Sequence, residues 1–207
     1  MAERPSQGLF WVITALLALV VAVFGYGVIR ERRAVESADD REVPRVLPAD
    51  PVRGQPGAPL TIIEYGDFFC PLCRSEQPAL KTFLVRYDAR VRLVWKDFPI
   101  TEQHPLDAAE AARCAQEQGA FWQMHDALFA HQETLGDAVY TSLAQNLGLD
   151  PQAFDECRAS DRTLALINES IEGGRRAGVD GTPLYFFGTT PVTQLPSPEA
   201  LDQFMQQ

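Results

Sequence analysis

Two of the four cysteines, Cys70 and Cys73, are separated by only two residues, a spacing that suits thiol-disulfide exchange. Pro71 fits the first turn of a helix, where a proline sacrifices no hydrogen bond. Cys70 would then sit at the helix N-terminus, where free N–H groups and the helix dipole stabilise a thiolate. Cys73, one turn further on, can reach Cys70 to close or resolve a mixed disulfide. The pair therefore predicts a redox centre.

A zinc site is one alternative for two cysteines at this spacing, but zinc would need a second close pair of ligands. The remaining cysteines are far apart, and the histidines make no pair of the zinc-finger type; they are Cys114, Cys157, His104, His125 and His131. We expect the histidines to be caps or packing residues, and we expect no metal and no cofactor. A purely structural disulfide between Cys70 and Cys73 is the other alternative.

The segments around the cysteines indicate a sheet interrupted by helices. Residues 60–65 (LTIIEY) and 91–98 (VRLVWKDF) have the patterns of strands, with a helix from Pro71 to about residue 87 between them. A stretch rich in Ala, Leu, Gln and Glu, from about 105 to 177, predicts four or five consecutive helices. The sheet resumes at 184–187, and Ser197-Pro198 predicts the start of a closing helix.

The N-terminal part contains an apolar segment, residues 9–29, which is 21 residues long and carries no charge. It matches the roughly 20 residues that cross a bilayer. A cleaved signal peptide is the alternative, but its apolar core is usually about 7 to 15 residues long. We therefore expect a short tail at 1–8, a transmembrane helix at 9–29, a linker at 30–57 rich in proline and charge, and one domain at 58–207.

Charge and topology give two further constraints. Residues 34–207 hold 14 basic and 26 acidic residues, a balance of −12 that argues against nucleic-acid binding. Arg4 precedes the apolar segment whereas Arg30, Arg32 and Arg33 follow it, which by the positive-inside rule would leave the domain in the cytoplasm. An even number of cysteines favours an oxidising compartment instead.

Three segments resemble the DsbA-type thiol-disulfide oxidoreductases, in particular their membrane-anchored bacterial branch: residues 64–73 (EYGDFFCPLC), 121–129 (FWQMHDALF) and 181–183 (GTP). The resemblance covers about residues 58–207. It implies an α/β, thioredoxin-like fold with a helical domain inserted at about 102–178, here preceded by the N-terminal transmembrane helix. It also implies export, so we expect a single-pass protein of the bacterial inner (cytoplasmic) membrane with its catalytic domain on the periplasmic side.

The resemblance assigns roles residue by residue. Cys70 matches the exposed nucleophile and Cys73 its buried partner, while Pro183 matches a cis-proline that packs against the disulfide. The backbone around Thr182 would pair with an extended substrate segment. We expect the dipeptide between the cysteines, Pro71 and Leu72, to contribute to substrate binding. A departure at residues 188–191 (GTTP), where the family has an Asn-Gly turn, predicts a short or irregular hairpin.

Glu64 lies where thioredoxin-like proteins often keep a buried acid that moves the proton of the inner cysteine. The alternative is a solvated acid at a strand end, but its neighbours look buried, and a burial-shifted carboxyl suits proton transfer. Lys96 is a guessed partner of Glu64.

Cys114 and Cys157 are either free buried residues or a disulfide. A disulfide would close a loop of about 44 residues and stabilise the fold by roughly 4 kcal/mol. The resemblance implies the disulfide.

These residues together predict a dithiol oxidase that introduces disulfides into exported proteins. The expected partners are exported proteins with cysteines and a membrane quinone-linked protein that re-oxidises the pair; we expect a monomer. A reductase or isomerase with the same residues stays open, because direction depends on reduction potential and partner. A redox-inactive thioredoxin-fold protein that only binds clients is a third possibility.

Overall fold

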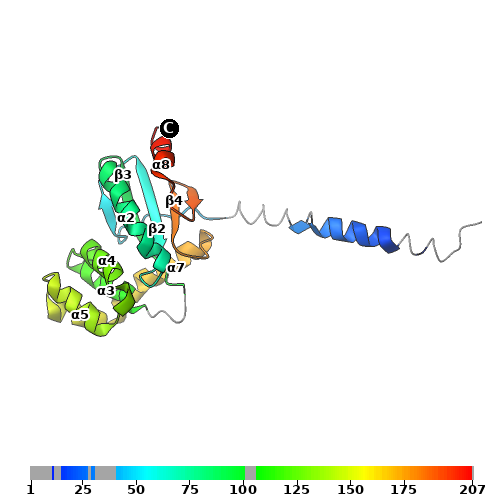
Figure 1. The fold of residues 1–207 in the computed structure, drawn as a ribbon. Coiled ribbons are helices and arrows are strands. Elements are labelled where there is room, and N and C mark those ends of the chain that lie inside the picture. The colour runs from blue at the N-terminus through cyan, green and yellow to red at the C-terminus, as the bar shows by residue number, and fades with distance from the viewer. Residues whose placement is uncertain (1–10, 12–14, 28, 31–40, 101–105, 207) are drawn as a thin grey trace, which may run out of the picture. The chain divides into compact units, whose positions relative to one another are not determined.

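The computed structural model describes residues 11, 15–27, 29–30, 41–100 and 106–206, and it divides into two compact units, Met1–Arg41 and Glu42–Gln207. In the first unit, residues 15–27 are helical (Figure 1). Among the described residues, no helix combines the length and the apolar character needed to cross a membrane. The tail at 1–8 and part of the anchor at 9–29 fall outside the described residues, so the anchor stays a prediction.

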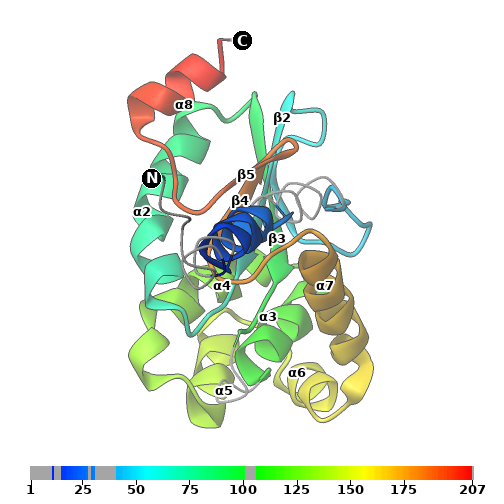
Figure 2. The same ribbon diagram turned by 90° about the vertical axis from the view of Figure 1, so that its right-hand side faces the viewer.

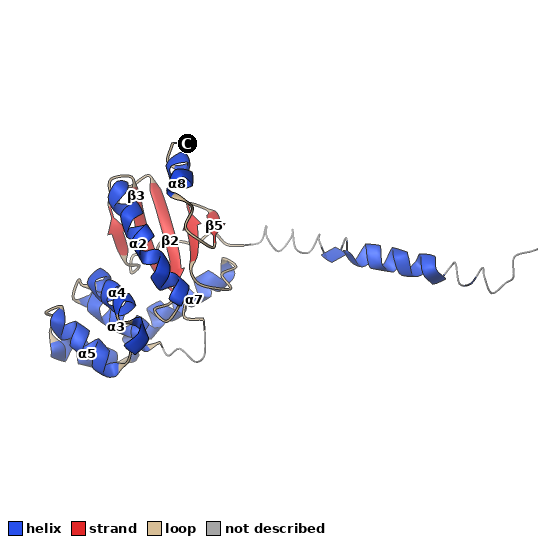
Figure 3. Ribbon diagram, in the orientation of Figure 1, coloured by secondary structure: helices blue, strands red, loops and turns tan. Residues whose placement is uncertain are grey.

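The second unit is built on a five-stranded sheet with the order β1-β3-β2-β4-β5 (Figure 3). Its strands are β1 (Val52–Gly54), β2 (Leu60–Gly66), β3 (Val91–Asp97), β4 (Leu184–Phe187) and β5 (Thr190–Val192). Helix α2 (Pro71–Arg86) connects the parallel strands β2 and β3, as the sequence predicts. Strand β4 runs antiparallel to β2 and forms a hairpin with β5. Gly188, with φ +62°, supplies the left-handed residue that this short turn needs.

Side-chain alternation along the central strands divides the core into two layers. Ile62 and Leu93 pack with α2 and the closing helix α8 (Pro198–Phe204). Ile63 and Val94 face the other way, toward helix α7 (Leu164–Arg176). Figure 2 shows α2 and α7 on opposite sides of the sheet. The two cysteines at the start of α2 therefore belong to the side of the sheet that α2 covers.

A helical insertion lies between β3 and β4, as predicted. In the described residues it comprises α3 (Asp107–Glu117), α4 (Phe121–Ala130), α5 (Asp137–Asn146), α6 (Pro151–Arg158) and α7, with 3-10 turns η1 (Gln132–Thr134) and η2 (Asp161–Thr163). Ala111, Ala112 and Ala115 are fully buried in α3, which lets neighbouring helices approach closely. The same hydrophobic cluster includes Phe68, Cys73 and Trp95, so the core of the insertion continues into the cysteine motif.

The domain begins earlier than the expected boundary at residue 58. Strand β1 pairs antiparallel with β3, and residues 42–57 belong to the same compact unit as the sheet. The linker expected at 30–57 is therefore shorter, although residues 31–40 lie outside the described part. A three-residue edge strand has too few positions to show a hydrophobic period, which explains why the sequence did not indicate it.

Candidate active site

Cys70 is the N-cap residue of α2, and both Cys70 and Cys73 are free thiols. The Cys70 Sγ accepts a hydrogen bond from the backbone N–H of Cys73 at 3.2 Å. No acidic residue occupies the first turn of α2 to oppose a negative charge there. A hydrogen bond from the Cys73 thiol, opposed by partial burial and helped by backbone N–H groups, lowers the pKa of Cys70 to about 6. At neutral pH Cys70 is therefore largely a thiolate, the nucleophilic form.

Cys73 has the opposite character. Its side chain is fully buried, and burial, followed by its hydrogen bond to Cys70, raises the pKa of the Cys73 thiol well above its ordinary value. Another molecule can therefore reach Cys70, which is partly exposed, whereas Cys73 is protonated and shielded from solvent. This asymmetry is what a two-step exchange needs: one sulfur that forms the mixed disulfide and one that resolves it.

Thr182 and Pro183 lie beside the motif although they are more than a hundred residues away in the chain. Their peptide bond is cis, and the Thr182 carbonyl oxygen lies 3.2 Å from the Cys70 Sγ. The Cys70 thiol can donate to this oxygen when it is protonated. Pro71 and Leu72 are exposed next to the sulfur, with Leu72 42 % exposed. Contact of these four residues with a substrate stays a prediction.

Glu64 is fully buried in β2 on the side that faces α2. Burial raises its pKa to about 8, against the opposing effect of a hydrogen bond from the Gln77 amide, which lies 3.1 Å from the Glu64 Oε1. The charge of Glu64 in turn contributes to the raised pKa of Cys73, so the two groups are within electrostatic reach. A carboxyl that titrates near neutral pH can accept and return a proton.

The guessed pairing of Glu64 with Lys96 is wrong. Lys96 binds Asp50, with 2.6 Å between Nζ and Oδ2, and both side chains are 4 % exposed. Glu64 is in register with Trp95, so Lys96, one residue later, points to the opposite face of the sheet. Alternation along β3 thus separates the two charges.

Gln132 is a site residue that the sequence analysis missed. From turn η1 of the insertion, its amide donates to the carbonyl oxygens of Phe68 at 2.7 Å and Cys70 at 2.9 Å. Nearby, Arg74 of α2 forms an exposed ion pair with Glu133. A lone glutamine in a polar turn, 62 residues after Cys70, carries no sequence signal. Gln77, in contrast, could be placed near the site from the sequence, because it lies four residues after Cys73 on the same face of the predicted helix.

His125, one of the histidines in the described part of the chain, is a packing residue of the core. His125 is fully buried among aromatic rings, including Phe68 and Trp95, and its Nδ1 lies 2.9 Å from Asp126. Burial lowers the pKa of His125, so its ring is neutral at physiological pH. His104 lies outside the described residues. Within the described ranges, no group of three potential ligands is placed to hold a metal.

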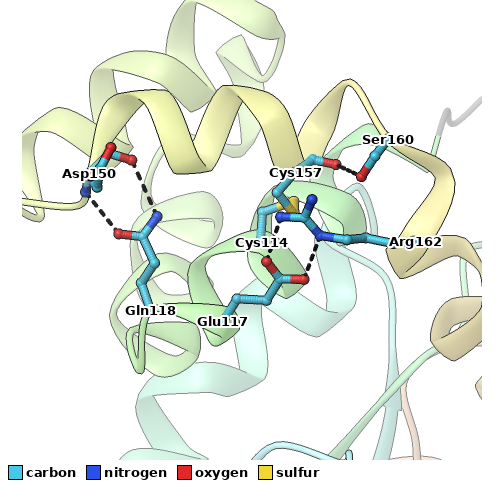
Figure 4. Close-up of a disulfide and its surroundings, with 7 residues drawn as sticks. All are labelled: Cys114, Glu117, Gln118, Asp150, Cys157, Ser160 and Arg162. Atoms are coloured by element: carbon cyan, nitrogen blue, oxygen red, sulfur yellow. Dashed lines mark hydrogen bonds and ion pairs between the residues drawn. A yellow bond between two sulfur atoms is a disulfide. The ribbon is translucent and has the colours of Figure 1, made fainter.

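The second cysteine pair forms a disulfide. Cys114 of α3 and Cys157 of α6 are joined with their Cα atoms 5.7 Å apart, and both are buried (Figure 4). Two further contacts lie near the bridge: Arg162 of η2 forms a bidentate pair with Glu117 of α3, and Gln118, the C-cap residue of α3, exchanges hydrogen bonds with the backbone of Asp150, the N-cap residue of α6. The bridge holds the helices of the insertion and takes no part in the surface around Cys70.

Comparison with known sequences gives one family and a set of longer relatives. A family profile described as Thioredoxin matches residues 47–207. The chain is 42 % identical over 163 residues to the Na(+)/H(+) antiporter NhaA 3 of Salinispora tropica, covering 76 % of this chain and 25 % of the antiporter. It is 33 % identical over 192 residues to NhaA 1 of Mycolicibacterium gilvum, covering 89 % and 31 %. The chain thus spans about a quarter to a third of these relatives.

Comparison with solved structures identifies the same fold in exchange proteins. BdbD from Bacillus subtilis superposes with a TM-score of 0.71 at 16 % identity, covering 80 % of this chain and 95 % of BdbD. The thiol-disulfide exchange protein alpha-DsbA2 from Wolbachia pipientis gives 0.68 at 21 %, covering 77 % and 87 %. A thioredoxin-like oxidoreductase from Silicibacter pomeroyi gives 0.66 at 27 %, covering 77 % and 92 %. The fold is therefore that of DsbA-type proteins.

Proposed function

This chain belongs to the thioredoxin family and has the fold of DsbA-type oxidoreductases, and on that premise we propose that it is a thiol-disulfide oxidoreductase acting as a dithiol oxidase on exported proteins. The observation that carries the proposal is Cys70, which is partly exposed at the N-terminus of α2 and stabilised as a thiolate, with Cys73 buried behind it. A stabilised thiolate favours the reduced form of the pair and makes its disulfide oxidising.

The exchange proceeds in two displacements. A client thiolate attacks the Cys70 Sγ of the disulfide form, the bond to Cys73 breaks, and Cys73 leaves with the electron pair and takes up a proton. A second client thiolate then attacks the client sulfur of the mixed disulfide, and Cys70 leaves as a thiolate. The low pKa of Cys70 makes it a good leaving group. The client loses two electrons, the pair gains them, and a quinone-linked membrane protein is the proposed acceptor.

The reduction potential tests the direction of the reaction. Equilibration of the purified chain with glutathione buffers is expected to give a potential above about −200 mV, on the side of DsbA rather than of thioredoxin at about −270 mV. The Cys70 thiolate, followed by its absorbance at 240 nm, is expected to titrate near pH 6. A potential near that of thioredoxin would favour the reductase alternative. A Cys70 that forms no mixed disulfide would favour the redox-inactive alternative.

We also propose that the domain lies on the periplasmic side of the bacterial inner membrane, anchored by residues 9–29. The disulfide between Cys114 and Cys157 supports this, because such bonds persist in oxidising compartments. Val85, 80 % exposed on α2, offers a labelling position. A Val85→Cys variant that also lacks Cys70 and Cys73 should react with a membrane-impermeant maleimide in intact cells. Labelling only after lysis would place the domain in the cytoplasm.

The antiporter relatives suggest a second proposal, concerning the partner rather than the chemistry. A continuous match over 76 % of this chain must span residues 70–73, and it occupies a quarter of the antiporter. We therefore propose that the domain also works beside membrane transport proteins, with their cysteines as candidate substrates. Ion transport itself is not proposed for this chain. Trapping with a Cys73→Ser variant, followed by identification of the disulfide-linked proteins, tests it: recovery of soluble exported proteins alone would contradict it.

A further inference from the structure

A buried acid that exchanges protons with Cys73 needs its own route to water. Glu64 is fully buried and Cys73 is fully buried, so neither can take a proton from bulk solvent directly. Each catalytic cycle of the proposed oxidase nevertheless requires Cys73 to gain a proton on reduction and to lose it on re-oxidation. The inference below rests on that proposed function and concerns the groups that carry this proton.

Tyr185 is the first group on such a route. It is the cross-strand partner of Glu64 in the antiparallel pair of β2 and β4, so both side chains project to the face that α2 covers. Its hydroxyl lies 3.5 Å from the Glu64 Oε1, and the residue is fully buried. The Gln77 amide donates to the same oxygen. The other carboxylate oxygen, Oε2, is buried with no hydrogen-bond partner among the described residues and is free to carry a proton.

Glu76 is the second group. It precedes Gln77 on α2 and lies three residues after Cys73, so Glu76 and Cys73 are neighbours on the helix surface. Its side chain is only partly buried, and its Oε2 is a buried atom with no partner among the residues described. Burial, then the charges of Glu64 and Glu76 and a hydrogen bond with the Glu76 side chain, raise the pKa of Tyr185, so the Glu76 carboxyl lies beside the same phenol as Glu64. Glu76 thus connects the interior with the surface.

We propose that Tyr185 and Glu76 form a proton path between Glu64 and solvent. When a client thiolate breaks the disulfide, Cys73 leaves as a thiolate and takes the proton of the Glu64 carboxyl. The Tyr185 hydroxyl then gives its proton to Glu64 as it receives one from Glu76, which is reprotonated by water. Re-oxidation runs the same transfers in reverse. The phenol is unchanged after each passage, and no electrons move along the path.

The groups that face Glu64 support this route over others. They are Cys70 and Cys73 at the motif, Glu76 and Gln77 on α2, and Tyr185 on β4. An amide such as that of Gln77 can hold the carboxyl but does not relay a proton. Cys70 is a thiolate when the pair is reduced and has no proton to give. Tyr185 and Glu76 are therefore the described groups able to pass a proton onward from Glu64.

The test compares two tyrosine variants of the full chain. Tyr185→Phe removes the relay hydroxyl and keeps the ring. Tyr65→Phe is the matched control, because Tyr65 is the next residue after Glu64 in β2 and is also buried, but on the opposite face. Single-turnover reduction of the Cys70–Cys73 disulfide by a dithiol peptide is followed from pH 5 to 9 in H2O and in D2O.

Tyr185→Phe and Glu76→Gln are expected to slow the reaction by about tenfold, a partial loss of general acid-base assistance, with an altered solvent isotope effect. The thiolate pKa of Cys70 should stay unchanged. In a Glu64→Gln background, Tyr185→Phe should have no further effect on the rate, because the carboxyl that exchanges the proton with Cys73 is absent. Equal rates for the two tyrosine variants, or an undiminished effect in the Glu64→Gln background, would overturn the path. A wild-type chain without exchange activity would instead overturn the proposed function.

Discussion

Both cysteine pairs of this domain can form a disulfide, but they differ in solvent exposure and in the charges around them. Cys70 and Cys73 lie where strand β2 is followed by helix α2, and Cys70 is partly exposed and stabilised as an anion. Cys114 and Cys157 lie inside the insertion, on helices that pack against each other, with neither sulfur accessible. One pair can be reached by another protein, and the other cannot. Solvent access to the sulfur and stabilisation of its thiolate, more than the presence of a disulfide, distinguish a reactive cysteine pair from a structural bridge.

The same contrast holds for the polar groups around each pair. Near the reactive pair lie the Glu64 carboxyl, whose pKa is close to neutral pH, and the Gln132 amide, which donates a hydrogen bond to the Cys70 carbonyl oxygen. The structural bridge is flanked by an ion pair and backbone hydrogen bonds that do not depend on its redox state. Removing one pair should therefore affect activity and removing the other should affect stability.

Loss of the reactive sulfur is expected to have the largest effect. Cys70→Ser should reduce the exchange rate to the uncatalysed background, because no other accessible thiolate is present in the described domain. Its thermal midpoint should change little. Cys73→Ser is the companion variant: it should still attack clients but accumulate mixed disulfides, visible on non-reducing gels. Residual turnover by Cys70→Ser would mean that the two pairs are not separated in function.

Removal of the structural bridge should have the next largest effect, and it should fall on stability. The double change Cys114→Ala with Cys157→Ala is expected to lower the free energy of unfolding by about 4 kcal/mol, because two residues with a sequence separation of 43 are no longer joined in the unfolded chain. Urea denaturation measures this. The Cys70 thiolate pKa should be unchanged; a shift would show that the bridge also shapes the active site.

Glu64 gives a pH-dependent stability effect. Its pKa is raised from 4.5 to about 8 in the folded state, so the folded chain binds more protons than the unfolded chain between these values. Stability should therefore fall as pH rises from about 4.5 to about 8 and stay level above, by roughly 4 to 5 kcal/mol, because a pKa difference of one corresponds to about 1.4 kcal/mol. Glu64→Gln should remove this slope. Denaturation at pH 5, 6.5 and 8 measures it, and parallel profiles for both proteins would refute the buried ionisation.

Gln132 is expected to give the smallest effect. Gln132→Glu places carboxylate oxygens against the carbonyls of Phe68 and Cys70, which costs about 1 to 3 kcal/mol in the local hydrogen bonds and raises the pKa of Cys70. We expect a several-fold slower attack on a model disulfide at pH 6. Gln145→Glu, exposed on α5, is the matched charge control. If both variants behave alike, Gln132 does not connect the insertion to the motif.

Much of the active site could be predicted because its signals are local. The Cys-Pro-Leu-Cys order places a proline at the first helical position and a cysteine at the cap, and the structure has both. The strand before it, the helix through residue 86 and the closing helix capped by Ser197 follow from short patterns and turn residues. The helical insertion was visible from composition and glycine breaks.

The remaining site contacts depend on elements that are far apart in the chain. Nothing near Lys96 indicates that its partner is Asp50, because that pairing follows from which face of β3 it occupies. Nothing near Gln132 indicates that its amide reaches the Cys70 carbonyl. The buried pair of Arg113 with Asp97, 2.6 Å apart, joins the insertion to β3 in the same way. Such contacts form only when separate elements pack.

The sequence by itself determined which sulfur would be the nucleophile, since helix start, proline position and dipole are properties of a few consecutive residues. Only the tertiary structure decided how that sulfur is controlled. Folding brings the Thr182 carbonyl, the Gln132 amide and the Glu64 carboxyl around the motif from three separate segments. The physical reason is that desolvation and long-range hydrogen bonding depend on packing, which no local pattern encodes.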